Sequence, residues 1–426
     1  MSEREGPPAG GARRKAPAGL RSVPWRRSYR RQRWLRLLAL GSALMLVVGA
    51  GVIWLLYEHL EDNIRTDTGA EAELRRHMAE RPPPGANGTQ NVLIIGTDSR
   101  SGGNDRYGAD SGTARSDTVI LLHLAAGRGS ATAVSIPRDL MVHVPSCRKP
   151  DGSQTAVQFA QFNWSFAWGG AACAIRTVEQ LTGIRIDHHV AVDFTGFKRM
   201  VDAVNGVEVC VPYQVHDTDA KLDLPAGRQM LHGEQALGYV RARHAFGDGS
   251  DTERMDRQQA FLASLVRKMQ SNGVLFNPTK LYPVLDAATS SLTADPGLNS
   301  LTKLYDLIRG LQKTPTDEIR FLTVPREPYA DDFNRDQLVH PQADQLFAAL
   351  RADQPVAVQP PAPTTSADQP PQGQTRNNPG PPVSDRGSPD APDGKAGSSP
   401  TPPPPGTMPT YPGTTAAHDV CDQMHQ

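Results

Sequence analysis

Cysteine is scarce in this sequence, and the chain has neither a visible internal repeat nor a net charge. The four cysteines among its 426 residues follow no zinc-binding spacing, so a structural zinc site is not expected. The formal charge of zero is an average over two unlike parts. Residues 1–36 carry a net charge of +9 and the remainder carries −9, so the average excludes no class of partner.

Long apolar runs are absent, with one exception at residues 37–57. These 21 residues contain no charged side chain, and at 1.5 Å per residue they span a bilayer core of about 30 Å. Trp34, Trp54 and Tyr57 lie near the ends of the run, as interfacial aromatic residues do. A cleavable signal peptide is the alternative, but the run is long for one and lacks a clear small-x-small cleavage site. We therefore predict a single transmembrane helix over 37–57.

The basic arm, residues 1–36, sets the orientation that we expect for this helix. By the positive-inside rule the arm stays in the cytoplasm and everything after Tyr57 lies outside the cell membrane. The arm could instead bind nucleic acid, but topogenic charge with contact to anionic lipids is the simpler explanation. We expect a membrane partner and no nucleic acid.

The composition divides the rest of the chain. Residues 58–89 are polar and suggest an extracytoplasmic stalk, residues 90–353 have the composition of a globular domain, and residues 354–413 are rich in proline. Residues 355–412 hold 18 of the 37 prolines, and such a segment cannot bury enough apolar surface to offset its ordering entropy. We predict that 354–413 is disordered, followed by a C-terminal segment, 414–426, that contains Cys421.

All four cysteines follow the apolar run, in a compartment that permits disulfides. Four cysteines allow three pairings, which the sequence alone leaves open. We expect Cys147 to pair with Cys173 and clamp the loop between them, and Cys210 to pair with Cys421 and tie the tail back.

Charged residues border three short apolar runs that predict buried strands, residues 91–95, 119–124 and 131–136. Asp98 follows the first run, Asp117 precedes the second and Arg138 follows the third. Ligands of open α/β folds gather at strand ends. Two carboxylates, completed by water and substrate phosphates, suit Mg²⁺ (or Mn²⁺), so Asp98 and Asp117 are metal candidates. Ordinary turn or cap residues are the alternative.

A second motif occupies residues 239–259. Its first five residues alternate and predict a strand that presents Arg241 and Arg243 on one face. Ser250 and Glu253 then form a capping box that opens a helix, which we expect to end near Gly273. The buried stripe of that helix is Met255, Leu262, Leu265, Val266 and Met269.

The cations of this motif are poorly explained by stability. Arg254 and Gln258 lie along the edge of the stripe, and an arginine in a first helical turn opposes the helix dipole by about 0.3–1 kcal/mol. Guanidinium groups and a helix N-terminus both suit phosphate, so we interpret the cluster as a polyanion site. The alternative is a solvated basic face.

Seven segments together resemble the LytR-CpsA-Psr family. They are GTDSR (96–100), ARSDT (114–118), SIPRD (135–139), FNWSFAWGG (162–170), TGIRIDHHVAVDFTGF (182–197), LPAGRQMLHGEQALGYVRAR (224–243) and SDTERMDRQQ (250–259). The resemblance covers roughly residues 90–325. It implies an α/β fold, layered α-β-α, with a mixed central sheet flanked by helices and preceded by one transmembrane helix. High usage of Arg, Ala, Gly and Pro suggests a high-GC actinobacterial source.

The resemblance also implies an activity: phosphotransfer of a glycopolymer, such as teichoic acid, from a polyprenyl-pyrophosphate carrier to a peptidoglycan hydroxyl in cell wall biogenesis. The diphosphate is common to teichoic, teichuronic, arabinogalactan and capsular chains, so the glycan itself stays open. Two alternatives use the same residues, a regulatory (attenuator) protein that binds polyprenyl pyrophosphate and a lipid pyrophosphatase. The presence of both Asp98 and Asp117 favours chemistry over binding alone.

The family's site residues carry over by motif. The resemblance implies a Mg²⁺-associated pair, Asp98 and Asp117, and an acidic residue that orders the arginines, Asp251. The pyrophosphate set is Arg138, Arg241, Arg243, Arg254 and Gln258, and Arg100 and Arg115 are motif arginines that we include as substrate-binding.

Three further features remain open at this point. Gln161 stands where the family often has a lysine, which removes a cation from the acceptor or glycan side. His244 is a possible base, although strand alternation would turn it away from the arginines. The apolar set Val190, Val192, Phe194, Phe197, Val201 and Val204 is either plain core or part of a prenyl slot.

Overall fold

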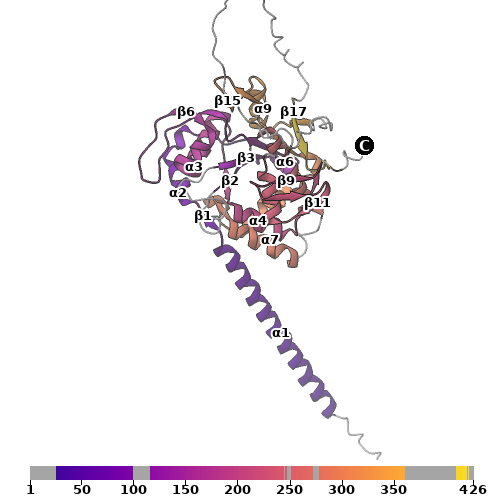
Figure 1. Ribbon diagram of the computed structural model, residues 1–426. Coiled ribbons are helices and arrows are strands. Elements are labelled where there is room, and N and C mark those ends of the chain that lie inside the picture. Colours follow the sequence, from indigo (N-terminus) through magenta and orange to yellow (C-terminus); the bar gives the residue numbers. More distant parts are fainter. Residues whose placement is uncertain are drawn as a thin grey trace, which may run out of the picture. The chain divides into compact units, whose positions relative to one another are not determined.

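The computed structural model describes residues 25–98, 116–243, 245–246, 251–271, 278–359, 409–419 and 421. The chain divides into two units, residues 1–58 and 59–426. The first unit contains most of helix α1 (Trp25–Asp62) (Figure 1). In the described part of the chain, α1 is the one helix long and apolar enough to cross a membrane, and it contains the run predicted at 37–57. Its apolar side chains from Trp34 to Tyr57 are exposed, as a segment that lies in lipid requires.

A nine-stranded mixed sheet forms the centre of the second unit, in the order β1-β12-β7-β2-β3-β4-β13-β17-β16. Strand β2 pairs in parallel with β7 and antiparallel with β3, and β4 pairs in parallel with β13. The strands are β1 (Arg65–Thr66), β2 (Gln90–Thr97), β3 (Ser116–Leu124), β4 (Ala131–Ile136), β7 (His188–Val192), β12 (Leu292–Ala294), β13 (Ile319–Thr323), β16 (Ala357–Gln359) and β17 (Thr410–Thr415).

Helices cover both faces of this sheet, because its central strands are apolar on both sides. Leu93 and Ile95 of β2 join a core with helices α2 (Thr68–Arg76), α3 (Phe162–Thr182) and α9 (Gln342–Arg351). Val92 and Ile94 face the opposite core, with α6 (Asp251–Ser271) and α8 (Leu301–Lys313). The layered α/β fold with a mixed sheet is confirmed.

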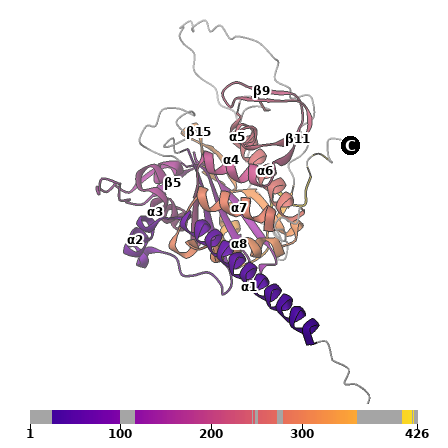
Figure 2. The ribbon, with the colours of Figure 1, turned by 90° about the horizontal axis from the view of Figure 1, so that it is seen from below.

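A third core lies on the α6 side of the sheet (Figure 2). Helices α4 (Phe194–Ala203) and α5 (Gly233–Arg241) pack there against two small antiparallel ladders, and α7 (Pro278–Ser291) packs on α4. The ladders are β8 (Val207–Val211) with β11 (Gly227–Leu231), and β9 (Val215–Asp217) with β10 (Leu222–Leu224).

Two hairpins follow the ends of β4 and β13. The first is β5 (Met141–Val144) with β6 (Gln158–Gln161), and the second is β14 (Arg326–Tyr329) with β15 (Asp332–Leu338). A bridge between Leu140 and Asp336 joins them.

Two of the predicted boundaries are corrected. The expected stalk, 58–89, is part of the domain, because Leu60, Ile64 and Leu74 are buried and β1 pairs with β12 in the sheet. The expected disordered segment, 354–413, is too long at both ends, because β16 and β17 lie within it or overlap it. Residues 360–408 lie outside the described part of the chain.

Both expected disulfides are present. Cys147 pairs with Cys173 at a Cα–Cα distance of 5.6 Å, and Cys210 pairs with Cys421 at 5.2 Å. The Cys210–Cys421 disulfide joins strand β8 to the segment that follows β17. Strand β17 itself pairs with β13. The tail therefore belongs to the folded domain.

Candidate functional site

A cavity of about 500 Å³ lies between the sheet and helices α4, α5 and α6. Apolar side chains form one part of its wall: Ile94, Ile120, Val192, Phe194, Phe197, Met200, Leu262 and Leu265. Charged side chains form another part, four arginines and four aspartates: Arg138, Arg241, Arg243, Arg254, Asp117, Asp193, Asp217 and Asp219. The cavity therefore offers one elongated ligand both an apolar surface and a cluster of cations.

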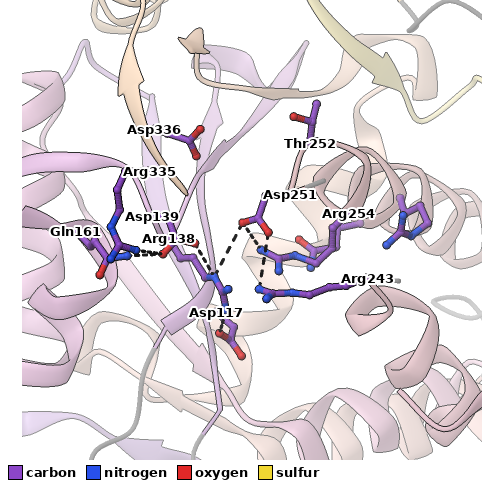
Figure 3. A network of polar contacts seen from close by, with 12 residues as sticks. Asp117, Arg138, Asp139, Gln161, Arg243, Asp251, Thr252, Arg254, Arg335 and Asp336 are labelled. Carbon is purple, nitrogen blue, oxygen red and sulfur yellow. Dashed lines mark hydrogen bonds and ion pairs between the residues drawn. The ribbon is translucent and has the colours of Figure 1, made fainter. Parts of the chain in front are cut away.

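Asp251 lies at the centre of the cation cluster (Figure 3). Its Oδ2 accepts a hydrogen bond from Arg254 Nη2 at 2.8 Å and is 4.0 Å from Arg138 Nε. Its Oδ1 is 3.7 Å from Arg243 Nη2. One carboxylate thus holds three guanidinium groups together, as the resemblance implied.

Burial makes Arg254 the most perturbed of these cations. Its side chain is 8% exposed, and this desolvation lowers its pKa to about 10. Asp251 opposes the shift, and the positive charges of Arg138 and Arg243 reinforce it. A bound polyanion would offset both the burial and the repulsion.

The charged form of Arg138, unlike that of Arg254, is stabilised overall by its surroundings. Burial opposes its charge, but Asp139, Asp117 and Asp251 together raise its pKa above the ordinary arginine value. Arg138 Nη1 donates to Asp117 Oδ1 at 2.9 Å, and its Nε donates to Asp139 Oδ2 at 3.1 Å. These carboxylates fix the direction of the guanidinium before any ligand arrives.

Helix α6 brings its N-terminus to the cluster. It begins at Asp251, as the capping box predicts, and ends at Ser271. Met255 is buried, and Leu262, Leu265, Val266 and Met269 pack against the cores, so the predicted stripe is confirmed. Ser250, Gly273 and His244 lie outside the described residues.

The strand predicted at residues 239–243 is wrong. Tyr239 and Arg241 belong to helix α5, and Arg243 follows two residues after its end. Ala236, Leu237 and Tyr239 are buried, at positions that suit one face of a helix. Arg241 and Arg243 nevertheless both line the cavity, with the Arg241 guanidinium 4.7 Å from the centre of the Phe194 ring.

Gln258 has a more specific role than was expected. It lines the cavity, but its Nε2 donates to the carbonyl oxygen of Val240 at 3.0 Å. This bond ties α6 to the last turn of α5 and so helps to position Arg241. Arg100 and Arg115 lie outside the described residues.

The two candidate metal ligands lie at one end of the sheet. Register pairs Gly96 with Thr118 and Thr97 with Ser116, with an irregularity between them, so Asp98 and Asp117 occupy neighbouring strand ends. Asp117 lines the cavity, whereas Asp98 is not among the described lining residues.

This oxygen donor set fits Mg²⁺ that takes its remaining ligands from phosphate and water. Ser116 Oγ, next to Asp117 in the chain, is buried and lacks a hydrogen-bond partner within the described ranges. Those ranges contain no group of three or more His, Cys, Asp or Glu side chains that could hold a metal by themselves.

Gln161 and a cation from another element, Arg335, share one carboxylate. Gln161 Nε2 donates to Asp139 Oδ1 at 2.5 Å, and Arg335 Nη1 of β15 is 3.7 Å from the same oxygen (Figure 3). The sequence did not indicate Asp139 or Arg335 as site residues. Asp139 follows Arg138 in the segment SIPRD (135–139), but no pattern in the sequence links Arg335 to Asp139.

The predicted apolar set divides between two roles. Val192, Phe194 and Phe197 line the cavity, whereas Val190, Val201 and Val204 are buried in the cores. Part of the set is therefore plain core, and the rest lines a cavity, as a prenyl slot would require.

Comparison with known proteins identifies the family of the chain. A model of the LytR_cpsA_psr family matches residues 58–352. The chain is 38% identical over 272 residues to the probable cell wall biosynthesis protein LcpB of Corynebacterium glutamicum, which covers 61% of each chain. It is 30% identical over 230 residues to the polyisoprenyl-teichoic acid–peptidoglycan teichoic acid transferase TagU of Enterococcus faecalis, covering 54% of this chain and 69% of TagU.

A solved structure, the LytR-Csp2A-Psr enzyme from Actinomyces oris, shares the fold. It aligns with a TM-score of 0.50 and 23% identity over 63% of this chain and 93% of its own. The family match extends over more than half of the chain and includes every described residue of the arginine cluster. The chain therefore belongs to the LytR-CpsA-Psr family.

Proposed function

We propose that this protein transfers a glycopolymer from a polyprenyl-pyrophosphate carrier to a hydroxyl group of peptidoglycan, forming a phosphodiester. The observation that carries the proposal is the cavity that joins an apolar wall to four arginines and Asp117. A prenyl diphosphate has an apolar chain that matches the apolar wall and, next to it, an anionic diphosphate that matches the arginines. The relative TagU is a polyisoprenyl-teichoic acid–peptidoglycan teichoic acid transferase, which supports the substrate class.

The reaction needs alignment and charge stabilisation more than covalent participation by the protein. The acceptor hydroxyl oxygen attacks the glycan-side phosphorus, and the bond from that phosphorus to the bridging oxygen breaks. Polyprenyl phosphate leaves with the bond electrons. The hydroxyl proton passes to a carboxylate, for which Asp98 and Asp117 are the candidates.

Three of the arginines are held by carboxylates in two different ways. Arg138 is oriented by Asp117 and Asp139, so it is pre-organised for the non-bridging oxygens of one phosphate. Arg243 and Arg254 share Asp251, and a diphosphate would compete with that carboxylate for them. Asp98 and Asp117 would hold Mg²⁺ (or Mn²⁺), which supplies charge neutralisation at the phosphates when bound.

Helix α1 supports a membrane location for the same reaction. We propose that α1 spans the cell membrane once, with its N-terminus cytoplasmic and the catalytic domain outside. The two disulfides support an oxidising compartment for the domain. The enzyme would then meet its lipid substrate at the outer leaflet.

A transfer assay tests the proposal against a lipid-binding regulator and a lipid pyrophosphatase. Full-length protein in detergent is incubated with Mg²⁺, a polyprenyl-pyrophosphate-linked oligosaccharide and soluble peptidoglycan oligomers. We expect the phosphodiester conjugate and polyprenyl phosphate in equal amounts, and neither product without acceptor. Phosphate release without acceptor would identify a pyrophosphatase, and binding without turnover would identify a regulator.

Two variants test the site assignment in the same assay. Arg241→Ala and Asp117→Ala should each abolish transfer while the fold survives. Glu208→Gln, which removes an exposed partner of Arg228, is the control and should transfer normally. Near wild-type turnover by both site variants would contradict the assignment.

A further inference from the structure

A group of aromatic rings lies outside the cavity, on the two hairpins that follow β4 and β13. We call it the aromatic patch: His143 on β5, Phe159 on β6 and Tyr329 on β14. The ring centres of His143 and Phe159 are 5.1 Å apart, and those of Phe159 and Tyr329 are 5.9 Å apart. Phe159 is 45% exposed.

Packing of the domain does not account for the patch. Val142, Val144 and Ala160 point inward and are buried in the core on the α3 side, so the alternation of the hairpin turns His143 and Phe159 outward. A single exposed apolar residue needs no explanation. Here three rings from three strands of two hairpins contact one another, and such a cluster needs an explanation.

The patch is continuous with the candidate site. Gln161 lies two residues after Phe159, on the same side of β6, and donates to Asp139. Asp139 in turn accepts from Arg138, which lines the cavity. Arg335 reaches the same carboxylate from β15. Two hydrogen bonds thus connect Gln161, which lies two residues from the patch, to Arg138.

The patch and the apolar wall of the cavity belong to opposite sides of the sheet. Ile94 and Ile120 of the wall face the α6 side, whereas the inward residues of the β5–β6 hairpin join the α3-side core. Arg138 and Asp117 lie at the strand ends between the two sides. In-line displacement at phosphorus requires that the attacking and leaving oxygens be on opposite sides.

We propose that the aromatic patch binds the pyranose rings of the acceptor glycan strand and so delivers its hydroxyl to the phosphorus from the side opposite the prenyl group. The inference rests on the proposed function, since it assigns the acceptor to a place beside the same site. A pyranose ring presents C–H bonds on its faces, and these pack against the electron-rich face of an aromatic ring. Gln161 and Arg335 supply polar groups between the patch and Arg138.

The test uses full-length protein in detergent and two variants of the patch. Phe159→Leu keeps an apolar side chain and loses the ring, and the double variant Phe159→Leu/Tyr329→Leu removes two rings. Met230→Leu on β11, where Met230 is 42% exposed, is the matched control. Soluble peptidoglycan glycan strands serve as the acceptor, and thermal unfolding verifies the fold of each variant.

We expect the double variant to bind the glycan strands about tenfold more weakly, since it loses two of the ring faces on which the pyranose rings pack. In the transfer assay the KM for acceptor should rise by a similar factor, while kcat and the affinity for geranylgeranyl pyrophosphate stay unchanged. The control should match the wild type in all three. Rescue of acceptor binding by Phe159→Trp would separate a ring contact from a general effect on packing.

Two outcomes would overturn the inference. One is unchanged glycan binding in the double variant. The other is a rise in KM for the lipid-linked donor instead of the acceptor, which would assign the patch to the donor glycan. Failure of the wild type to transfer would contradict the proposed function, whereas glycan binding is measured without turnover and so distinguishes the two failures.

Discussion

The substitution Asp251→Asn tests whether a diphosphate and this carboxylate compete for the same cations. Asp251 makes one short charged hydrogen bond, 2.8 Å to Arg254, and two longer contacts, 3.7 Å to Arg243 and 4.0 Å to Arg138. Asparagine preserves the shape of the side chain and removes its charge. Arg243 and Arg254 then lose their shared carboxylate, whereas Arg138 keeps Asp117 and Asp139.

The expected loss of stability follows from these contacts. A hydrogen bond between charged groups contributes about 1.5–3 kcal/mol, and Arg254, which accounts for the short one, is buried. The longer contacts are half-exposed and are screened by solvent, so they add little. We expect the unfolding free energy of the unliganded protein to fall by about 2 kcal/mol, which in a domain of this size lowers the Tm by about 4 °C.

The bound state distinguishes this explanation from a simple structural role. A diphosphate that occupies the cluster supplies the missing negative charge, so saturating inorganic pyrophosphate should restore most of the lost Tm. By linkage the variant should bind pyrophosphate more tightly than the wild type. Differential scanning fluorimetry with and without pyrophosphate measures both quantities, with Glu208→Gln as the control. An equal loss of Tm in the free and bound states would refute the reasoning, because Asp251 would then not compete with the ligand.

Three further predictions follow from the same structure. Arg254→Ala should lower transfer by about 10³-fold, since an arginine that stabilises a phosphoryl transition state is worth about 10³–10⁵ in rate, and steady-state kinetics check this. Burial lowers the pKa of Arg254 to about 10, so its positive charge destabilises the free protein below that pH, and the charge is lost as the pH rises through 10. The affinity for inorganic pyrophosphate, measured by calorimetry, should therefore fall as the pH rises through about 10. Full affinity well above that pH would contradict the assignment. Replacing Cys421 by Ser should lower the unfolding free energy by about 2–5 kcal/mol, because Cys210–Cys421 closes a long loop; thermal unfolding measures this, and reductant should destabilise the wild type at least as much, because it also opens Cys147–Cys173.

The residues of the site were predictable because each lies in a local motif with chemical meaning. Asp117 and Arg138 were assigned from strand ends, Arg254 from a helix start and Arg243 from the alternation of a predicted strand, and the structure brings all four to one cavity. The secondary structure around Arg241 was not predictable in the same way. Five alternating residues fit a strand, but the preceding Ala236 and Leu237 extend the apolar pattern at helical spacing and bury α5.

Contacts between distant segments were invisible in the sequence. Strands β1 and β16 have two and three residues, too few for a periodic pattern, and β17 follows a proline-rich stretch that suggests disorder. Arg335 reaches Asp139 across almost two hundred positions, so no local signal joins them. The expected Cys210–Cys421 pairing was the one indication that the tail returns to the domain.

The central sheet of the domain is incomplete without strand β17, which pairs with β13. The hydrogen-bonding edge of β13 is covered by a segment that the ribosome produces some ninety positions later. Until that segment arrives, an uncovered edge can pair with another chain. A version shortened within the proline-rich stretch would keep every arginine of the cluster and still expose this edge, so truncations made for crystallisation should retain residues 409–421.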